Sequence, residues 1–186
     1  FLSDMQTIML ETKQRDKLVS PKIKQNRTFL IRKSFNNNML FIRRYKMKEK
    51  VYVGVIGGRS TEKEMEKAAF EIGKHIAEQG WVLVCGGMGG VMEAACRGAK
   101  EVGGTTLGIL PGNYRHEANP HLSYSVVTGL NEARNSIVAK SSDAIIAIDG
   151  HFGTLSEIAF ARMYGVPVIG FDTWNVDPEK NRGHSL

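Results

Sequence analysis

The chain has 186 residues, with 25 lysines and arginines against 19 aspartates and glutamates, and its charge is unevenly divided. Residues 1–50 carry a net charge of +9 and no glycine, whereas residues 51–186 carry −3 and all 20 glycines. Because the basic excess belongs to the first part, the isoelectric point of about 9.4 does not make the glycine-rich part a nucleic-acid binder.

Composition also argues against several classes of protein. No stretch approaches about 18 consecutive apolar residues, so no membrane-spanning helix is expected. The two cysteines, Cys85 and Cys96, are too far apart for a C-x-x-C motif, and the five histidines show no metal-ligand spacing. A disulfide scaffold or a zinc site is therefore not expected. Since no secretory signal is visible, we expect a cytoplasmic protein.

Residues 1–46 form a basic extension for which three interpretations stay open. Its apolar residues come in small clusters with weak periodicity. One interpretation places it outside the native domain, with a natural start at Met47 or Met39. A second makes it a disordered or loosely helical arm that contacts nucleic acid or acidic lipid. The third is a targeting peptide.

Residues 47–174 are predicted to form one domain in which strands alternate with helices. Apolar runs predict six strands, at residues 51–56, 81–85, 105–110, 124–127, 143–148 and 166–171. Helical spacing of apolar residues predicts four helices, at residues 60–79, 91–102, 130–141 and 154–164. A capping box of Thr61 and Glu64 begins the first helix, and Gly80 ends it.

Strands that are apolar on both faces and alternate with helices predict an α/β protein with a doubly wound, Rossmann-like parallel sheet in three layers. Residues 175–186 are expected to be a polar tail. In such a sheet the loops after the strands line the ligand crevice. Glycine-rich turns before helix N-termini suit an anion, so we predict that a phosphorylated small molecule binds there. For the loop at residues 86–90, a tight turn without a ligand is the alternative.

The candidate ligand-binding residues lie in or beside these loops. They are Gly57, Gly58, Arg59, Ser60, Gly86, Gly87, Met88, Gly89, Gly90, Pro111, Asn135, Gly150, His151, Phe152, Gly153 and Thr154. The standard signatures are absent: Met92 stands where a dinucleotide-binding G-x-G-x-x-G motif needs its last small residue, and the chain has neither a P-loop nor a G-x-S-x-G motif.

Three segments resemble signatures of the Lonely Guy (LOG) superfamily, at residues 86–95 (GGMGGVMEAA), 104–111 (GTTLGILP) and 150–157 (GHFGTLSE). Residues 51–174 as a whole resemble its molybdenum-cofactor-carrier-like branch, which is related to DprA. The resemblance implies a homodimer or higher homo-oligomer formed through helices near the last signature. The candidate contact residues are Ile137, Val138, Ile158, Ala159, Phe160 and Met163.

The phosphoribohydrolases of this superfamily release a base from a nucleoside 5′-monophosphate, and Arg134 and Glu157 match their catalytic arginine and glutamate. A carboxylate stabilises an oxocarbenium-like state, and a guanidinium holds a phosphate. The structural alternatives, without a catalytic role, are a capping box of Thr154 with Glu157 and a pairing of Arg134 with Glu132 or Asp143.

Asp149 and His151 depart from the signature, because the enzymes have proline and glycine at these positions. We therefore favour a protein that binds a nucleotide or a phosphorylated pterin such as the molybdenum cofactor, as a carrier or sensor, and that requires no other cofactor. The first alternative is a phosphoribohydrolase that uses Arg134 and Glu157. The second is a nucleic-acid-associated protein that acts through the basic arm. Lysine decarboxylation, which needs a pyridoxal site, has no support in the sequence.

Overall fold

The structure is a computed structural model that describes residues 28–35, 39–46 and 50–175. The chain divides into two compact units, Phe1–Lys50 and Val51–Leu186. Residues 1–27, the predicted start at Met47 and the end of the polar tail lie outside the described residues.

The first unit contains an antiparallel pair of strands, β1 (Thr28–Phe35) and β2 (Met39–Lys46). Their register runs from Thr28 opposite Lys46 to Phe35 opposite Met39. Neither strand is predicted from the sequence, because the apolar clusters here do not alternate with polar residues as a half-buried strand requires. These two segments are therefore strands, whereas one interpretation of the extension expects a disordered or loosely helical arm.

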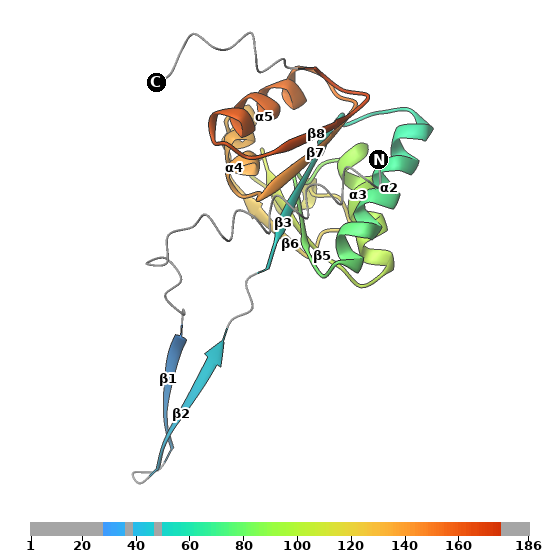
Figure 1. The fold of residues 1–186 in the computed structure, drawn as a ribbon. Coiled ribbons are helices and arrows are strands. Elements are labelled where there is room, and N and C mark those ends of the chain that lie inside the picture. The colour runs from blue at the N-terminus through green and yellow to red at the C-terminus, as the bar shows by residue number, and fades with distance from the viewer. Residues whose placement is uncertain (1–27, 36–38, 47–49, 176–186) are drawn as a thin grey trace. The chain divides into compact units, whose positions relative to one another are not determined.

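The second unit is built on a sheet of six parallel strands in the order β6-β5-β4-β3-β7-β8 (Figure 1). The strands are β3 (Tyr52–Gly57), β4 (Val82–Cys85), β5 (Thr105–Leu110), β6 (Tyr124–Val127), β7 (Ala144–Ile148) and β8 (Val168–Phe171). In the central strand β3, Gly54 pairs with Val84 on one side and Ile145 on the other. The strand order reverses at β3, so its carboxyl end is the topological switch point where ligands bind in such sheets.

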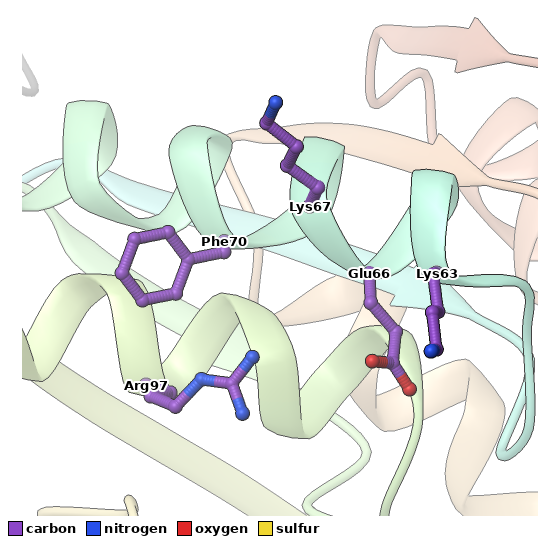
Figure 2. Close-up of a pocket in the computed structure, with 5 residues that line it drawn as sticks. All are labelled: Lys63, Glu66, Lys67, Phe70 and Arg97. Carbon is purple, nitrogen blue, oxygen red and sulfur yellow. The ribbon is translucent and has the colours of Figure 1, made fainter.

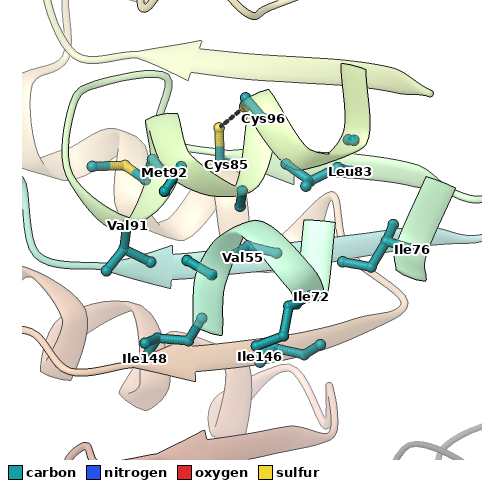
Figure 3. Packing of buried hydrophobic residues seen from close by; sticks show 14 of the residues in the cluster. Val55, Ile72, Ile76, Leu83, Cys85, Val91, Met92, Cys96, Ile146 and Ile148 are labelled. Carbon is teal, nitrogen blue, oxygen red and sulfur yellow. Dashed lines mark hydrogen bonds between the residues drawn. The ribbon is translucent and has the colours of Figure 1, made fainter. Parts of the chain in front are cut away.

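Four α-helices of the described residues cover the two faces of this sheet. They are α2 (Lys63–Glu78), α3 (Val91–Glu101), α4 (Asn135–Lys140) and α5 (Phe152–Met163). One core cluster joins α2 and α3 to β3, β4 and β7, with Val55, Ile72 and Ile146 among its members (Figure 3). A second cluster on the opposite face contains Val138 from α4 and Ile158 from α5. The predicted three-layer, doubly wound fold is confirmed.

Helices α2 and α3 approach each other so closely that two positions leave no room for a side chain. A Cβ on Gly73 would collide with the carbonyl oxygen of Ala95, and a Cβ on Gly98 would collide with that of Phe70. Both helices follow parallel strands, so their N-termini lie at the carboxyl edge of the sheet. The close packing therefore fixes the spacing of the two loops that precede these helices.

The predicted capping box at the start of α2 is wrong. The helix begins after Glu62, which has an extended backbone, and no side-chain hydrogen bond caps it. The Thr61 hydroxyl instead donates to Asp149 Oδ2 at 2.6 Å. The Thr61 side chain therefore forms a tertiary contact between the loops after β3 and β7 instead of capping α2. The predicted end of the helix at Gly80 is confirmed, since its φ of +73° and its hydrogen bond to the Ala77 carbonyl end the helix.

The predicted third helix is divided. It begins as a 3₁₀ turn, Asn131–Arg134, and continues as the short helix α4. None of the helices in the described part of the chain is long and apolar enough to cross a membrane.

Candidate functional site

Three loops meet at the carboxyl edge of the sheet, after β3, β4 and β7. A Cβ on Gly57 would collide with the Ile148 carbonyl at the end of β7 and would meet Val91 at the start of α3. The Val91 N–H donates to the Gly58 carbonyl at 3.1 Å. Gly90, with a φ of +65°, has no room for a Cβ against the same carbonyl. Backbone contacts that tolerate only glycine thus bring the predicted loop residues together.

Arg134 and Glu157 form an ion pair beside these loops. Arg134 Nη1 donates to Glu157 Oε1 at 3.0 Å, and each residue is only 5% exposed. The guanidinium lies against Gly86, where a Cβ would collide with both of its terminal nitrogens. The glycine loop after β4 therefore covers a buried charge pair.

Both alternative interpretations of Arg134 and Glu157, a capping box and a local ion pair, are wrong. The N-cap of α5 is His151, and no side-chain hydrogen bond caps this helix. The Glu157 carboxylate accepts from Arg134 instead of capping the Thr154 amide. Arg134 pairs with Glu157 rather than with Glu132 or Asp143. Residues that are 23 positions apart are brought together because α4 and α5 pack side by side on one face of the sheet.

The electrostatics of this pair differ from those of an exposed ion pair. Burial raises the pKa of Glu157 to about 7, although the charge of Arg134 and its hydrogen bond act in the opposite direction. Arg134 Nε is buried and has no acceptor, and no other buried side-chain nitrogen or oxygen of the described residues lacks a partner. The guanidinium thus keeps donor capacity for an anionic oxygen, and the carboxyl group exchanges its proton near neutral pH.

The loop after β7 is held from two sides. Asn135 Nδ2 donates to Ser156 Oγ at 2.7 Å and to the Gly153 carbonyl at 3.4 Å. Gly150 has a φ of +102° and lies against the buried Thr154 side chain. Asn135 therefore positions the start of α5 through side-chain bonds, and Thr154 does so by packing beneath the loop.

The two residues that depart from the LOG signature have different surroundings. Asp149 has a φ of +51°, and its carboxylate accepts from Thr61. The His151 side chain is exposed at the N-cap position of α5. Hydrogen bonding to Thr61 occupies the Asp149 carboxylate, and the exposed imidazole leaves the interior of the loop to backbone atoms.

Two glycines of these loops are not explained by the protein itself. Among described glycines without a positive φ, all but Gly89 and Gly153 would place a Cβ within 3.0 Å of another atom. A Cβ on Gly153 would meet nothing within 4 Å, and one on Gly89 would make its nearest contact at 3.4 Å. Glycine costs roughly 0.5–1 kcal/mol relative to alanine within a helix, and Gly153 lies in the first turn of α5. The protein itself therefore leaves open space at Gly153 and room for a Cβ at Gly89.

The remaining predicted residues occupy the rim of this site. Pro111 is buried, and its carbonyl accepts from the Asn131 amide at 3.0 Å, which ties the loop after β5 to the turn that carries Arg134. The Met88 carbonyl accepts from Asn119 Nδ2 at 3.1 Å. Arg59 and Ser60 are exposed. Phe152 is also exposed, at the first position of α5.

Sequence reasoning missed three residues that position the loops, namely Thr61, Asn119 and Asp149. Asn119 bonds to a loop 31 residues away, and Thr61 to one 88 residues away. No local sequence pattern indicates such contacts, because they depend on which strands are neighbours in the sheet.

Of the expected dimer contacts, Val138 and Ile158 belong to the core of the single chain. Ile137 and Phe160 are partly buried against the same core, whereas Ala159 and Met163 are exposed on α5. The homo-oligomer stays a prediction.

A separate concavity lies between α2 and α3 (Figure 2). It is lined by Lys63, Glu66, Lys67, Phe70 and Arg97, and the Arg97 guanidinium lies 5.5 Å from the centre of the Phe70 ring. It contains none of the predicted site residues.

The two cysteines are free and buried, with their sulfur atoms 3.6 Å apart (Figure 3). Their hydrogen bond, followed by burial, raises the pKa of the Cys96 thiol far above its ordinary value. No group of three or more His, Cys, Asp or Glu side chains in the described part of the chain is placed to hold a metal ion.

The fold and the site define a Rossmann-like protein with glycine-rich loops over a buried Arg–Glu pair. The profile of the SLOG cluster4 family matches residues 50–185, and the chain belongs to this family. The predicted relationship to the LOG superfamily and its molybdenum-cofactor-carrier-like branch is confirmed by this match and by the relatives below.

Two sequence relatives cover much of the second unit. An uncharacterized protein from Archaeoglobus fulgidus is 43% identical over 113 residues, which are 61% of this chain and 74% of that protein. A cytokinin riboside 5′-monophosphate phosphoribohydrolase from Mycobacterium tuberculosis is 34% identical over 124 residues, and the match covers 61% of this chain and 66% of the enzyme.

Solved structures of similar proteins include two from the molybdenum-cofactor branch. The molybdenum cofactor binding protein of Rippkaea orientalis is 41% identical with a TM-score of 0.65, and the match covers 69% of this chain and 80% of that one. The molybdenum cofactor carrier protein of Chlamydomonas reinhardtii is 39% identical with a TM-score of 0.63, covering 72% and 82%. The DNA processing protein A of Helicobacter pylori shares the fold at 23% identity and a TM-score of 0.55, covering 64% of each chain.

Proposed function

We propose that this protein binds a phosphorylated small molecule, a nucleotide or a phosphorylated pterin such as the molybdenum cofactor, and acts as its carrier or sensor. The ligand lies against the loops after β3, β4 and β7. The observation that carries the proposal is the open space at Gly153, together with the room for a Cβ at Gly89. At neither position does a neighbouring atom or the backbone conformation require glycine.

Two further features support an anionic group at this place. Helices α3 and α5 begin in these loops without a side-chain cap. The first amide of α3, that of Val91, donates to the Gly58 carbonyl, whereas the amides in the first turn of α5 are available to phosphate oxygens. Arg134 adds a buried positive charge with an unused donor at Nε. The similarity to two proteins that bind or carry the molybdenum cofactor agrees with a phosphorylated pterin as one candidate ligand.

The proposal is tested by placing a methyl group in the open space. Gly153→Ala should leave the melting temperature of the free protein unchanged or raise it, because the new Cβ meets no protein atom. It should abolish the rise in melting temperature that AMP, GMP, CMP, IMP or the molybdenum cofactor gives with the unmodified protein. Ala159→Ser, on the exposed side of the same helix, is the matched control and should keep the response. If none of these ligands shifts the melting temperature of the unmodified protein, the proposal fails.

The buried pair of Arg134 and Glu157 favours a second candidate, a nucleoside 5′-monophosphate phosphoribohydrolase. A carboxyl group with a pKa of about 7 can stabilise an oxocarbenium-like state or orient water. The phosphoribohydrolase from Mycobacterium tuberculosis is a relative of this chain. Incubation with AMP, GMP, CMP and IMP, followed by chromatography of the free base, tests the activity. If the protein releases the base and Glu157→Gln abolishes this release, the protein is a phosphoribohydrolase. If a ligand binds and no base is released, the result supports the carrier or sensor and excludes the phosphoribohydrolase.

A further inference from the structure

Phe152 and Trp174 form an exposed aromatic pair beside the loop after β7. Phe152 is 77% exposed, more than any other large apolar residue in the described part of the chain, and Trp174 is 40% exposed. Their ring centres are 5.7 Å apart at an interplanar angle of 31°. Since Phe152 directly precedes Gly153, this pair lies next to the proposed phosphate position.

The segment after β8 is held against this loop by two hydrogen bonds. Trp174 Nε1 donates to the Gly150 carbonyl at 3.2 Å, and the Thr173 hydroxyl donates to the Asp149 carbonyl at 2.6 Å. Trp174 is therefore fixed by its polar atom, and its ring supports one side of the Phe152 ring. The rest of the Phe152 ring faces solvent, although an aromatic ring of this size ordinarily gains stability from burial.

We propose that Phe152, supported by Trp174, is a stacking surface for the planar heterocycle of the bound phosphorylated ligand. The proposal rests on the proposed function, which places the phosphate at the amides of the first turn of α5. Neighbouring Cα atoms lie about 3.8 Å apart, so the ring attached to Phe152 is well within the reach of a base or pterin whose phosphate lies at Gly153.

The chemistry of the pair defines the class of ligand. A phenylalanine ring makes no hydrogen bonds, so it recognises the flat face of a heterocycle rather than the pattern of its edge. The site should therefore accept several bases and should prefer a nucleoside monophosphate or a phosphorylated pterin to a sugar phosphate that has no ring system to stack.

The test compares AMP with ribose 5-phosphate by titration calorimetry on three forms of the full chain. Relative to the unmodified protein, Phe152→Leu should weaken AMP binding by about tenfold, because it removes the stacking of one base on an aromatic ring. It should change ribose 5-phosphate binding by less than about twofold, because this ligand does not stack. Phe152→Tyr keeps the aromatic face and should retain AMP binding.

A spectroscopic measurement reports on the same contact. The chain has two tryptophans, so in a Trp81→Phe background the fluorescence comes from Trp174 alone. AMP should change this fluorescence, and ribose 5-phosphate at saturation should not.

The outcomes separate this proposal from the proposed function. If neither AMP nor ribose 5-phosphate binds the unmodified protein, both are overturned for this class of ligand. If both ligands bind and Phe152→Leu weakens them equally or not at all, the stacking surface is overturned while the phosphate site stands. A change in oligomeric state on Phe152→Leu, seen by sedimentation, would also overturn the proposal, since the aromatic pair would then belong to a contact between copies of the chain.

Discussion

Arg134 donates from Nη1 to Glu157 Oε1 at 3.0 Å, and both residues are almost completely removed from solvent. Taking two charges out of water costs several kcal/mol per ion, and a single hydrogen bond with an unsatisfied Nε offsets this cost poorly. The pair therefore contributes little to the stability of the fold, which agrees with the role proposed for it at the ligand.

The stability of the protein should depend on pH through Glu157. Its folded-state pKa of about 7 lies above its ordinary value of 4.5, so between these values the folded chain holds a proton that the unfolded chain has lost. The free energy of unfolding should fall as pH rises through this interval, by about 3 kcal/mol, and level off above it. Urea denaturation of the unmodified protein and Glu157→Gln at several pH values measures the difference. Parallel pH profiles for the two forms would contradict the expectation.

The contact between Gly86 and the Arg134 guanidinium predicts a specific effect of added volume. Gly86→Ala should displace the guanidinium, destabilise the protein by about 1–3 kcal/mol and remove the ligand-induced rise in melting temperature. Gly89→Ala is the matched control for stability, since the nearest atom to its Cβ is at 3.4 Å. Thermal unfolding of both variants checks this, and equal melting temperatures for the two would show that Gly86 is not constrained by Arg134.

The close contact of α2 with α3 predicts that helix propensity is overridden at one glycine. Alanine is about 1 kcal/mol better than glycine inside a helix, yet Gly98→Ala should destabilise by about 1–3 kcal/mol because its Cβ meets the Phe70 carbonyl. Gly153→Ala, also in a helix but without neighbours, should not destabilise. Denaturant midpoints of the two variants are the measurement. A neutral or stabilising Gly98→Ala would mean that the helices are further apart than described.

The two cysteines should be inaccessible to thiol reagents in the native protein. Both are fully buried, and the hydrogen bond with Cys85 together with burial keeps the Cys96 thiol protonated at neutral pH. Ellman's reagent should label neither thiol without denaturant and both thiols in denaturant. Rapid labelling of one thiol per native chain would contradict the buried pair.

The sequence predicted the six strands and four helices of the second unit closely, because apolar runs and helical spacing are local signals. It also placed the candidate site residues in loops that the structure brings together at the carboxyl edge of the sheet. It misjudged the cap of α2, since Thr61 bonds to Asp149 rather than to its own helix. It could not assign partners to Arg134 and Glu157, because each had an alternative partner or role nearby in the sequence.

The sequence by itself determined the fold class, the family and the set of candidate loop residues. These depend on apolar periodicity, glycine positions and the spacing of signatures, which are all local features of the sequence. Only the tertiary structure decided which glycines the protein itself requires and which leave space, as at Gly153. It alone showed that a buried guanidinium and carboxyl meet beneath Gly86. These outcomes depend on which strand ends are neighbours, and burial depends on what the rest of the fold places around each side chain.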